Sequence, residues 1–247
     1  MKIIAIIQAR MESTRLPGKV MKEICGKPIL EHIVSRVKLS KKLDEVIVAT
    51  SINKADDAID LWAERNKVSC FRGSQDNVLE RFAKCAEIYN PDIIVRLTAD
   101  NALIDADIID KGIEEFLKEN NDYIYYKKGL PLGMAVEIFN YCSLKKAYQE
   151  ADNMECLEHV TPYIYRNPDK FNIKYYDNKE DLSNIRWTID TVYDYTVVSN
   201  IYEKLYSAYG YEFGFDKILK TYMEHEEWNN INSEVEQVKI SYNENCI

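Results

Sequence analysis

The chain has 247 residues, and 46% of them are hydrophobic, which fits one α/β domain of ordinary size with a substantial core. The formal net charge of −9 argues against nucleic acid as a general partner. Residues 1–42 nevertheless carry ten Lys and Arg against three Glu, and a basic end on an acidic protein fits a small anionic ligand.

The six cysteines, at positions 25, 70, 85, 142, 156 and 246, lack the spacing of a metal finger or a Cys-x-x-Cys motif. They fall in apolar stretches, so we expect free, buried thiols in a reducing compartment. The first apolar run is short and a polar loop follows it, which is not the pattern of a signal segment. No apolar run approaches the roughly eighteen residues of a membrane span. We therefore expect a cytoplasmic protein without a membrane partner.

Residues 3–7 form an apolar run that predicts a strand buried on both faces, in the middle of a parallel sheet. The loop that follows, 8–19, contains three cations, two hydroxyls and a Pro-Gly turn: Arg10, Arg15, Lys19, Ser13, Thr14, Pro17 and Gly18. Ligands of open α/β sheets bind at the carboxyl ends of the strands. Cations and hydroxyl donors at that edge suit a polyphosphate, and the alternative is a solvated basic loop.

This loop has neither the Gly-x-x-x-x-Gly-Lys-Ser/Thr pattern nor the Gly-x-Gly-x-x-Gly pattern. Residues 7–19 read Ile-Gln-Ala-Arg-Met-Glu-Ser-Thr-Arg-Leu-Pro-Gly-Lys. They resemble the nucleotide-binding signature of the cytidylyltransferases that make CMP-activated acidic sugars, most of all the spore-coat polysaccharide biosynthesis protein F branch. The resemblance implies a three-layer α/β/α Rossmann-like nucleotidyltransferase fold with a mainly parallel central sheet. It also implies nucleotide contacts from this loop: Gln8, Ala9, Arg10, Ser13, Arg15 and Lys19.

The next elements are a helix at 28–38, a strand at 45–50 and a helix at 54–65. Ser51 and Asn53 follow the strand, where they would reach a nucleotide or cap the next helix, and both interpretations stay open. Residues 69–72 predict a third strand. The segment 73–81, Gly-Ser-Gln-Asp-Asn-Val-Leu-Glu-Arg, resembles a family motif and leads into a helix that ends at Tyr89. We expect nucleotide contacts from Ser74 and Asn77, with a helix cap at Asp76 as the alternative.

Residues 93–97 predict a fourth strand, and Asp100 follows its carboxyl end. A carboxylate there suits Mg²⁺, although Asp is also common in turns. The family has Thr-Gly-Asp-Cys-Pro-Leu-Ile at this place, with a metal-site Asp, and the resemblance therefore implies that Asp100 binds metal and nucleotide. This chain departs from the pattern by Ala99, Asn101 and Ala102.

A helix at 106–120 and a strand at 122–126 precede a Gly- and Pro-rich connection, a segment at 135–139 and a helix at about 143–151. Residues 155–166 favour a helix despite Pro162. Two further motifs of this tyrosine-rich region match the family, and the resemblance implies that Glu137, Glu158 and His159 line the acceptor side. On spacing alone, His159 is instead a structural histidine.

Strands are predicted at 171–175 and, last, at 185–189. Thr191 and Asp194 form a capping pair for a helix that runs to about Leu205, but capping does not explain Asp190. The family has an Asp here that joins the metal site, so the resemblance implies the same for Asp190. Residues 206–247 are expected to be helical and acidic. We describe one domain, with a nucleotide-binding half (1–121), an acceptor and dimerisation lobe (122–180) and a closing strand and helices (181–247).

Transfer of a nucleotidyl group from a triphosphate needs neutralised charge, an aligned nucleophile and a metal more than a covalent intermediate. We assign this work to Arg10, Arg15, Lys19, Asp100 and Asp190. The resemblance implies CTP as donor, Mg²⁺ as cofactor, an acidic 2-keto-3-deoxy sugar as acceptor and a homodimer. Three alternatives stay open: a glycosyltransferase with a nucleotide-sugar donor, a phosphate or phosphonate acceptor, and a non-catalytic nucleotide-binding protein.

Overall fold

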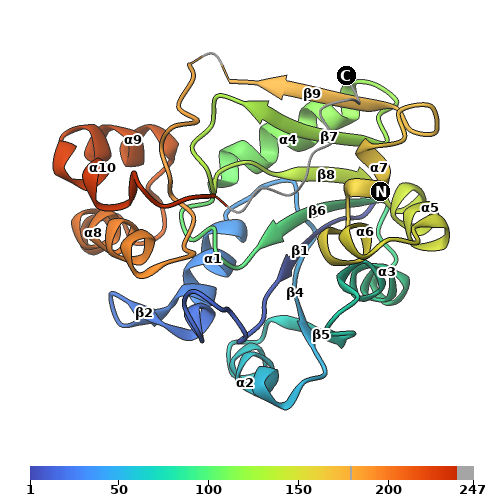
Figure 1. The fold of residues 1–247 in the computed structure, drawn as a ribbon, viewed down its shortest axis with the longest axis horizontal. Helices are drawn as coiled ribbons and strands as arrows, with labels where there is room; N and C mark the ends of the chain where they lie inside the picture. The colour runs from blue at the N-terminus through green and yellow to red at the C-terminus, as the bar shows by residue number, and fades with distance from the viewer. Residues whose placement is uncertain (179, 238–247) are drawn as a thin grey trace.

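A seven-stranded sheet forms the centre of the molecule (Figure 1), in a computed structural model that describes residues 1–178 and 180–237. Its strand order is β5-β4-β1-β6-β8-β7-β9. The strands are β1 (Ile3–Gln8), β4 (Glu45–Ser51), β5 (Ser69–Gly73), β6 (Ile93–Thr98), β7 (Tyr123–Lys128), β8 (Glu137–Asn140) and β9 (Ile173–Asp177). Only β8 runs antiparallel to its neighbours within this sheet, so the prediction of a mainly parallel sheet is confirmed.

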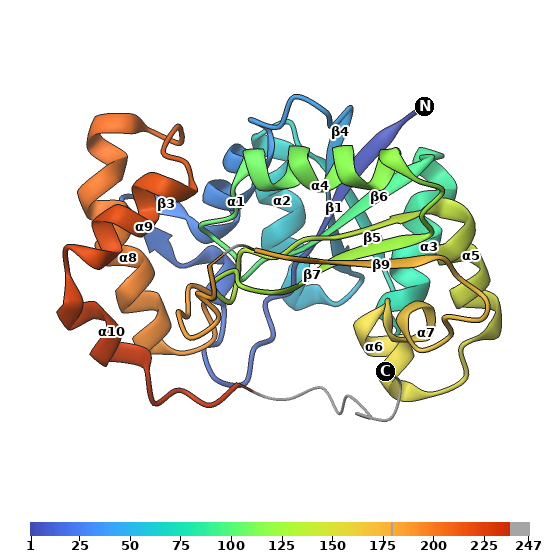
Figure 2. The ribbon, with the colours of Figure 1, turned by 90° about the horizontal axis from the view of Figure 1, so that it is seen from above.

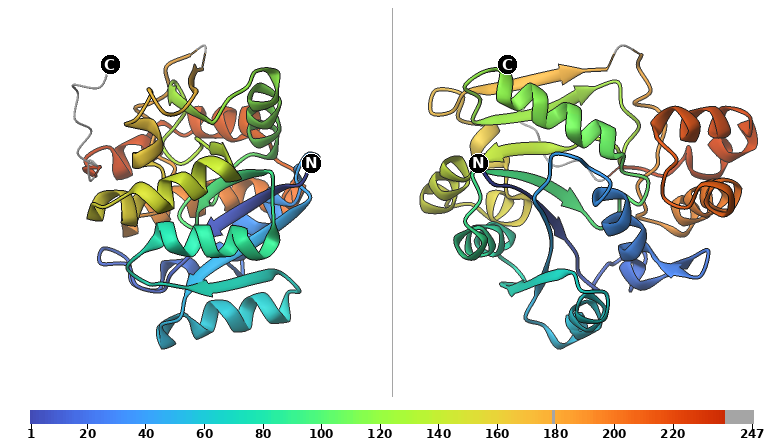
Figure 3. Two further views of the ribbon diagram at one scale, coloured as in Figure 1. Left: turned by 90° about the vertical axis from the view of Figure 1, so that its right-hand side faces the viewer. Right: turned by 180° about the vertical axis from the view of Figure 1, so that it is seen from behind.

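Helices cover both faces of the sheet and produce three layers (Figure 2). One face packs against α1 (Ile29–Val37), α2 (Asp57–Arg65), α4 (Ala106–Lys118), α8 (Val192–Tyr209), α9 (Phe215–Met223) and α10 (Glu226–Asn232). The other packs against α3 (Val78–Tyr89), α5 (Tyr141–Glu150), α6 (Met154–His159) and α7 (Pro162–Tyr165). Seen from behind, α4 lies across the sheet and α8 to α10 gather at one end (Figure 3). The expected three-layer α/β/α architecture is therefore present.

The alternation of side chains along β6 fixes what each face of the sheet presents. Ile94 packs into the core on the α3 and α5 side, whereas Val95 and Leu97 pack into the core on the α1 and α4 side. Because successive strand residues point to opposite faces, Arg96 and Thr98 project on the same side as Ile94. The polar residues at the carboxyl end of β6 are thus directed toward α3, α6 and α7.

The prediction of a strand at 185–189 is wrong. This segment makes a single parallel bridge, in which Arg186 pairs with Leu132, and it has no further ladder. The next residue, Gly133, has a φ of +103°. A Cβ at this position would lie 2.7 Å from the Thr188 nitrogen, so the two segments approach closely there without further strand pairing. The segment is nevertheless well buried, since Trp187 and Ile189 are both 0% exposed.

The helix expected at 155–166 is divided into α6 and α7. Val160 has a φ of +71° and ends α6, and Pro162 occupies the first turn of α7, where its missing N–H costs nothing. The expectation of buried thiols is wrong for Cys25 and Cys142, which are exposed, and right for Cys85 and Cys156. Cys246 lies outside the described residues.

The remaining short elements are the strands β2 (Glu23–Ile24) and β3 (Lys27–Pro28) and the 3-10 helices η1 (Lys19–Met21) and η2 (Lys54–Asp56). The helical expectation for 206–247 is confirmed by α9 and α10, and its last part, 238–247, lies outside the described residues. Within the described ranges, none of the helices combines the length and the apolar character that crossing a membrane requires.

Candidate active site

A cavity of about 710 Å³ opens at the carboxyl ends of β1 and β6, within the size range of small-molecule sites. The loop 8–19 forms much of its wall, and residues 98–100 and Asp190 form the opposite side. All five predicted catalytic residues line it together with three predicted nucleotide contacts: Arg10, Arg15, Lys19, Asp100, Asp190, Gln8, Ala9 and Ser13. Sequence motifs that lie far apart in the chain are thus brought to one edge of the sheet.

Backbone contacts hold the loop 8–19 against the sheet. The Gly18 N–H donates to the Met11 carbonyl at 2.9 Å, so the loop closes on itself, and Gly18 has the left-handed φ of +67° that this turn requires. The Met11 N–H donates to the Asp56 carboxylate at 2.7 Å. Asp56 is 2% exposed and also accepts from Ser51. The cations of the loop therefore project from a backbone that is fixed at both ends.

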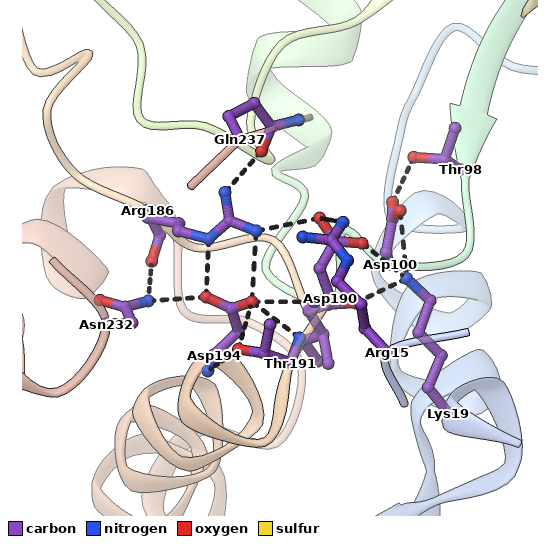
Figure 4. Close-up of polar contacts among 11 residues, drawn as sticks. Arg15, Lys19, Thr98, Asp100, Arg186, Asp190, Thr191, Asp194, Asn232 and Gln237 are labelled. Carbon is purple, nitrogen blue, oxygen red and sulfur yellow. Dashed lines mark hydrogen bonds and ion pairs between the residues drawn. The ribbon is translucent and has the colours of Figure 1, made fainter. Parts of the chain in front are cut away.

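Lys19 lies between the two predicted metal ligands (Figure 4). Its Nζ is 3.0 Å from Asp190 Oδ1 and 3.4 Å from Asp100 Oδ2. It also donates to the Ile189 carbonyl at 2.6 Å. One ammonium therefore keeps two like-charged carboxylates close together.

The main chain joins the two carboxylate-bearing segments directly. The Ile189 N–H donates to the Asp100 carbonyl at 2.8 Å. Asp100 is also fixed by its own strand end, because the Thr98 hydroxyl donates to its carboxylate. The spacing of Asp100 and Asp190 is consequently set by backbone as well as by side chains.

Asp190 is surrounded by cations. Besides Lys19, it contacts Arg15 Nη2 at 3.2 Å and Arg186 Nη2 at 2.9 Å. Arg186 in turn contacts Asp194 through Nε at 2.7 Å (Figure 4). Three cations therefore contact this single side chain, which lines the cavity.

Asp194 is the buried anchor of this arrangement. It is 0% exposed and accepts from Arg186, from the Asp190 and Thr191 N–H groups and from Asn232 Nδ2. Burial by itself raises the pKa of Asp194, but the hydrogen bonds and the charge of Arg186, with the smaller contributions of Asn232 and the Asp190 N–H, outweigh it and leave that pKa below its ordinary value. The predicted capping box of Thr191 and Asp194 is also present.

Arg186 and Asn232 are functional neighbours that sequence reasoning did not assign. Arg186 lies four residues before Asp190 in the same segment, Arg-Trp-Thr-Ile-Asp, so a signal for it existed. Asn232 comes from α10, and its Nδ2 also donates to the Arg186 carbonyl at 3.0 Å. No local pattern connects it with the site.

The donor set fits Mg²⁺. Asp100 and Asp190 offer hard carboxylate oxygens, and the Lys19 ammonium that contacts both shows that one cation can be shared by the pair. Among the described residues, no group of three or more His, Cys, Asp or Glu side chains is arranged to hold a metal. Mg²⁺ typically binds through one or two carboxylates together with substrate phosphates and water, so two carboxylates beside a triphosphate site suffice.

Three other predicted nucleotide contacts do not line this cavity. Ser51 is 1% exposed and donates to Asp56 at 2.5 Å. Asn77 caps α3 by accepting from the Glu80 N–H, so the cap lies at Asn77 and not at Asp76 as the alternative had it. Ser74 accepts from the Asn77 N–H at 3.1 Å. Each of these side chains is engaged in local structure, and nucleotide contact remains a prediction for all three.

The predicted acceptor residues lie on the face of the sheet that carries α6 and α7. Glu137 pairs with Arg96 across β8 and β6, and it accepts from Tyr123 at 2.7 Å and from Thr161 at 2.5 Å. Arg96 also donates to Gln8, a residue of the cavity wall, at 3.1 Å. A series of polar contacts thus runs from the cavity wall at Gln8 through Arg96 to Glu137.

His159 and Glu158 lie at the end of α6, near the polar contacts between Arg96 and Glu137. His159 is half-buried, and burial lowers its pKa. The charge of Glu158 raises this pKa, whereas the charge of Arg96 lowers it further. Glu158 is exposed. Acceptor binding by Glu137, Glu158 and His159 remains a prediction.

Comparison with known proteins gives consistent matches over nearly the whole chain. The model of the Cytidylyltransferase family matches residues 4–245. Spore coat polysaccharide biosynthesis protein SpsF of Bacillus subtilis is 35% identical, over 82% of this chain and 87% of that protein. A 3-deoxy-manno-octulosonate cytidylyltransferase of Geobacter metallireducens is 30% identical, over 67% of this chain and 75% of that protein. A solved cytidylyltransferase structure from Leptospira borgpetersenii superposes with a TM-score of 0.88 at 33% identity and covers 97% of this chain and 99% of its own.

Proposed function

Because the chain belongs to the cytidylyltransferase family and is a CTP-dependent nucleotidyltransferase, we propose that it transfers CMP to a sugar acid of the 2-keto-3-deoxy type and releases pyrophosphate. The observation that carries the proposal is the cavity in which Arg10, Arg15 and Lys19 face Asp100 and Asp190. This is a site for a polyanion and a cation together, and CTP with Mg²⁺ is such a pair.

In this proposal the loop cations bind the triphosphate. Arg15 offers a planar fork that suits a phosphate, and Lys19 acts as a point charge. Their charge stabilises the pyrophosphate as its bond to the α-phosphate breaks. Arg15 and Lys19 contact Asp190 in the structure, so triphosphate binding exchanges carboxylate partners for phosphate partners.

Asp100 and Asp190 would hold Mg²⁺. When bound, the ion supplies Lewis-acid polarisation of a phosphoryl oxygen. The chain's own contribution is to fix the two carboxylates, through the Ile189–Asp100 backbone hydrogen bond and the Arg186–Asp194 anchor.

The acceptor would bind beside the donor, toward β8 and α6. The position of Glu137 and His159, reached from the cavity wall through Gln8 and Arg96, supports this side. The similarity to a 3-deoxy-manno-octulosonate cytidylyltransferase supports a sugar acid as the acceptor. The similarity to a spore coat polysaccharide biosynthesis protein supports a product used in polysaccharide or glycan synthesis.

The proposal includes a homodimer and a cytoplasmic location. The lobe 122–180 would form the dimer interface, as the family resemblance implies. The cytoplasmic location agrees with the five described cysteines, all of which are free thiols.

The first test titrates the protein with CTP, UTP, ATP and GTP in the presence of Mg²⁺. We expect CTP to bind most tightly, and a preference for another triphosphate would contradict the donor assignment. The second test follows pyrophosphate release from CTP with 3-deoxy-manno-octulosonate, N-acetylneuraminate, ribose 5-phosphate, 2-aminoethylphosphonate or glucose as acceptor. Release with 3-deoxy-manno-octulosonate or N-acetylneuraminate, but not with the other three compounds, supports the proposal. Release with only ribose 5-phosphate or 2-aminoethylphosphonate refutes the acceptor class.

A matched pair of variants tests the metal site. Asp190→Asn should abolish pyrophosphate release while CTP still binds measurably. Asp216→Asn, at an exposed position of α9, should retain wild-type turnover. Full activity of Asp190→Asn would remove this residue from the metal site.

A further inference from the structure

We propose that Arg96 is the residue that receives the carboxylate of the acceptor, and that Glu137 positions Arg96 rather than contacting the acceptor. This inference rests on the proposed acid acceptor. It gives a specificity role to a residue of β6 that the sequence did not single out.

Arg96 is in the right place. It lies two residues before Thr98 and four before Asp100, on the face of the sheet that carries α6 and α7. Its Nη2 donates to the side chain of Gln8, which lines the phosphate cavity. An acceptor seated next to the α-phosphate of CTP would therefore meet Gln8 first and Arg96 directly behind it.

The hydrogen bonds of Arg96 are incomplete. Nη1 faces Glu137 and Nη2 faces the neutral amide oxygen of Gln8. The Nε atom is buried and has no hydrogen-bond partner in the structure. An unpaired donor on a charged group is costly inside a protein, so an arrangement that supplies a partner is favoured.

The free donor and Nη2 lie on the same edge of the guanidinium. That edge presents two parallel N–H groups, and it matches a carboxylate in the two-pronged geometry. If the Gln8 amide turns aside, one carboxylate satisfies both groups. Arg186 already makes this two-pronged contact, because its Nε and Nη2 both donate to Asp194. Its Nη2 also contacts Asp190, so one guanidinium that binds two acids has a precedent in this molecule.

Glu137, in contrast, already accepts three hydrogen bonds. Arg96, the Tyr123 hydroxyl and the Thr161 hydroxyl all donate to its carboxylate. Its side chain is only 13% exposed. The Tyr123 and Thr161 hydroxyls stabilise part of the negative charge of Glu137. Arg96 is therefore not the only group that balances this charge, and it can bind a second anion.

A purely structural ion pair between β6 and β8 is the competing explanation, since Arg96 and Glu137 are partners in the sheet register. That explanation accounts for Nη1 alone. It gives no reason for the free Nε or for the contact with a neutral amide at the cavity wall. The position of Arg96, its unpaired Nε and a Glu137 that already accepts three hydrogen bonds together favour a ligand site.

The test compares an acid with its neutral counterpart. The probes are 3-deoxy-manno-octulosonate and N-acetylneuraminate, each paired with its 1-carboxamide, and kcat/KM is measured for each. Wild-type protein should prefer the acid by at least about tenfold, the size expected for charge-assisted hydrogen bonds. Arg96→Met should bring the acid-to-amide ratio close to one and leave the KM for CTP within about twofold.

Further variants separate binding from folding. Arg96→Lys keeps the positive charge but loses the two parallel N–H donors, so it should restore part of the acid-to-amide preference. If Arg96→Met fails to fold, Arg96→Lys is measured in its place. Arg166→Met is the matched control, because Arg166 pairs with Glu155 away from the cavity, and it should keep the wild-type ratio.

The outcomes are distinguishable from failure of the proposed function. Equal loss with acid and amide in the Arg96 variants overturns this inference while CTP transfer to an acid stands. Turnover of wild type only with acceptors that lack a carboxylate overturns both this inference and the acceptor class. Absence of CTP binding overturns the donor site itself.

Discussion

The anchor beneath Asp190 should be one energetic unit. Arg186 contacts Asp194 at 2.7 Å, and their side chains are 8% and 0% exposed. Replacing Arg186 by Met leaves a buried carboxylate without its main counter-ion. Replacing Asp194 by Asn leaves the buried Arg186 guanidinium without its nearest carboxylate partner. We therefore examine Arg186→Met, Asp194→Asn and the double variant.

The magnitude follows from the burial. Removing one partner of a buried, hydrogen-bonded ion pair typically costs about 3–5 kcal/mol in the free energy of unfolding. The double variant leaves no unpaired charge, so its cost should be close to that of one single variant, with a coupling free energy of about 3 kcal/mol, equal to the lower end of a single cost. A typical domain has about 5–15 kcal/mol of stability, so the single variants are expected to remain folded in the absence of denaturant.

The assay is urea-induced unfolding of the four proteins, read by tryptophan fluorescence, because Trp187 directly follows Arg186 in the core. A second cycle with Lys42→Met and Glu114→Gln serves as the control. Their side chains are 33% and 54% exposed, and exposed pairs couple by less than about 1 kcal/mol.

Additive costs in the Arg186–Asp194 cycle would refute the reasoning. So would turnover that is unchanged in Arg186→Met, because Arg186 also holds Asp190 at 2.9 Å. We expect kcat to fall in that variant by at least tenfold, with CTP affinity less affected, since an unheld Asp190 loses its fixed position.

Three further outcomes are expected. Lys19→Ala should weaken CTP binding by at least about tenfold and CMP binding far less, and equal loss for both ligands would exclude contact with the β- and γ-phosphates. Burial lowers the pKa of His32, so the unfolded chain binds the proton more readily as pH falls below about 6.5; between pH 7.5 and 5.5 the unfolding free energy of wild type should fall by more than that of His32→Gln, and equal losses would contradict this. Gly133→Ala should cost about 1–3 kcal/mol more than Gly26→Ala, because a Cβ would lie 2.7 Å from the Thr188 nitrogen at the first site and meets nothing within 4 Å at the second; similar melting temperatures would refute the close approach.

Much of the fold and the centre of the site follow from local signals. The run at 3–7 is apolar on both faces and became the central strand β1, and the cations of the loop behind it line the cavity as expected. Asp100 and Asp190 each follow a short apolar segment, and both reached the same edge. The loop cations and Asp100 could be placed at this edge because strand position and side-chain chemistry pointed the same way, whereas Asp190 was assigned from the family resemblance.

What the sequence could not show depends on contacts between distant segments. The run at 185–189 has the composition of a strand, but it pairs through a single bridge, from Arg186 to Leu132. Arg96 stands in an otherwise apolar run of β6, and its partner Glu137 is distant in sequence. Asn232 reaches the site from α10, and no spacing rule connects it to Asp194.

The cations at the site have two different tasks, which their burial separates. Arg186 has an 8% exposed side chain and is tied to Asp194, so it cannot leave Asp190 without exposing a buried charge. Arg15 has a 35% exposed side chain and belongs to the loop that lines the cavity, so it can exchange Asp190 for a phosphate at low cost. Lys19 is intermediate, because it contacts both carboxylates and is 12% exposed. A fixed arginine behind the carboxylates and movable cations in front of them allow one site to stay assembled when empty and still release its charges to an incoming triphosphate.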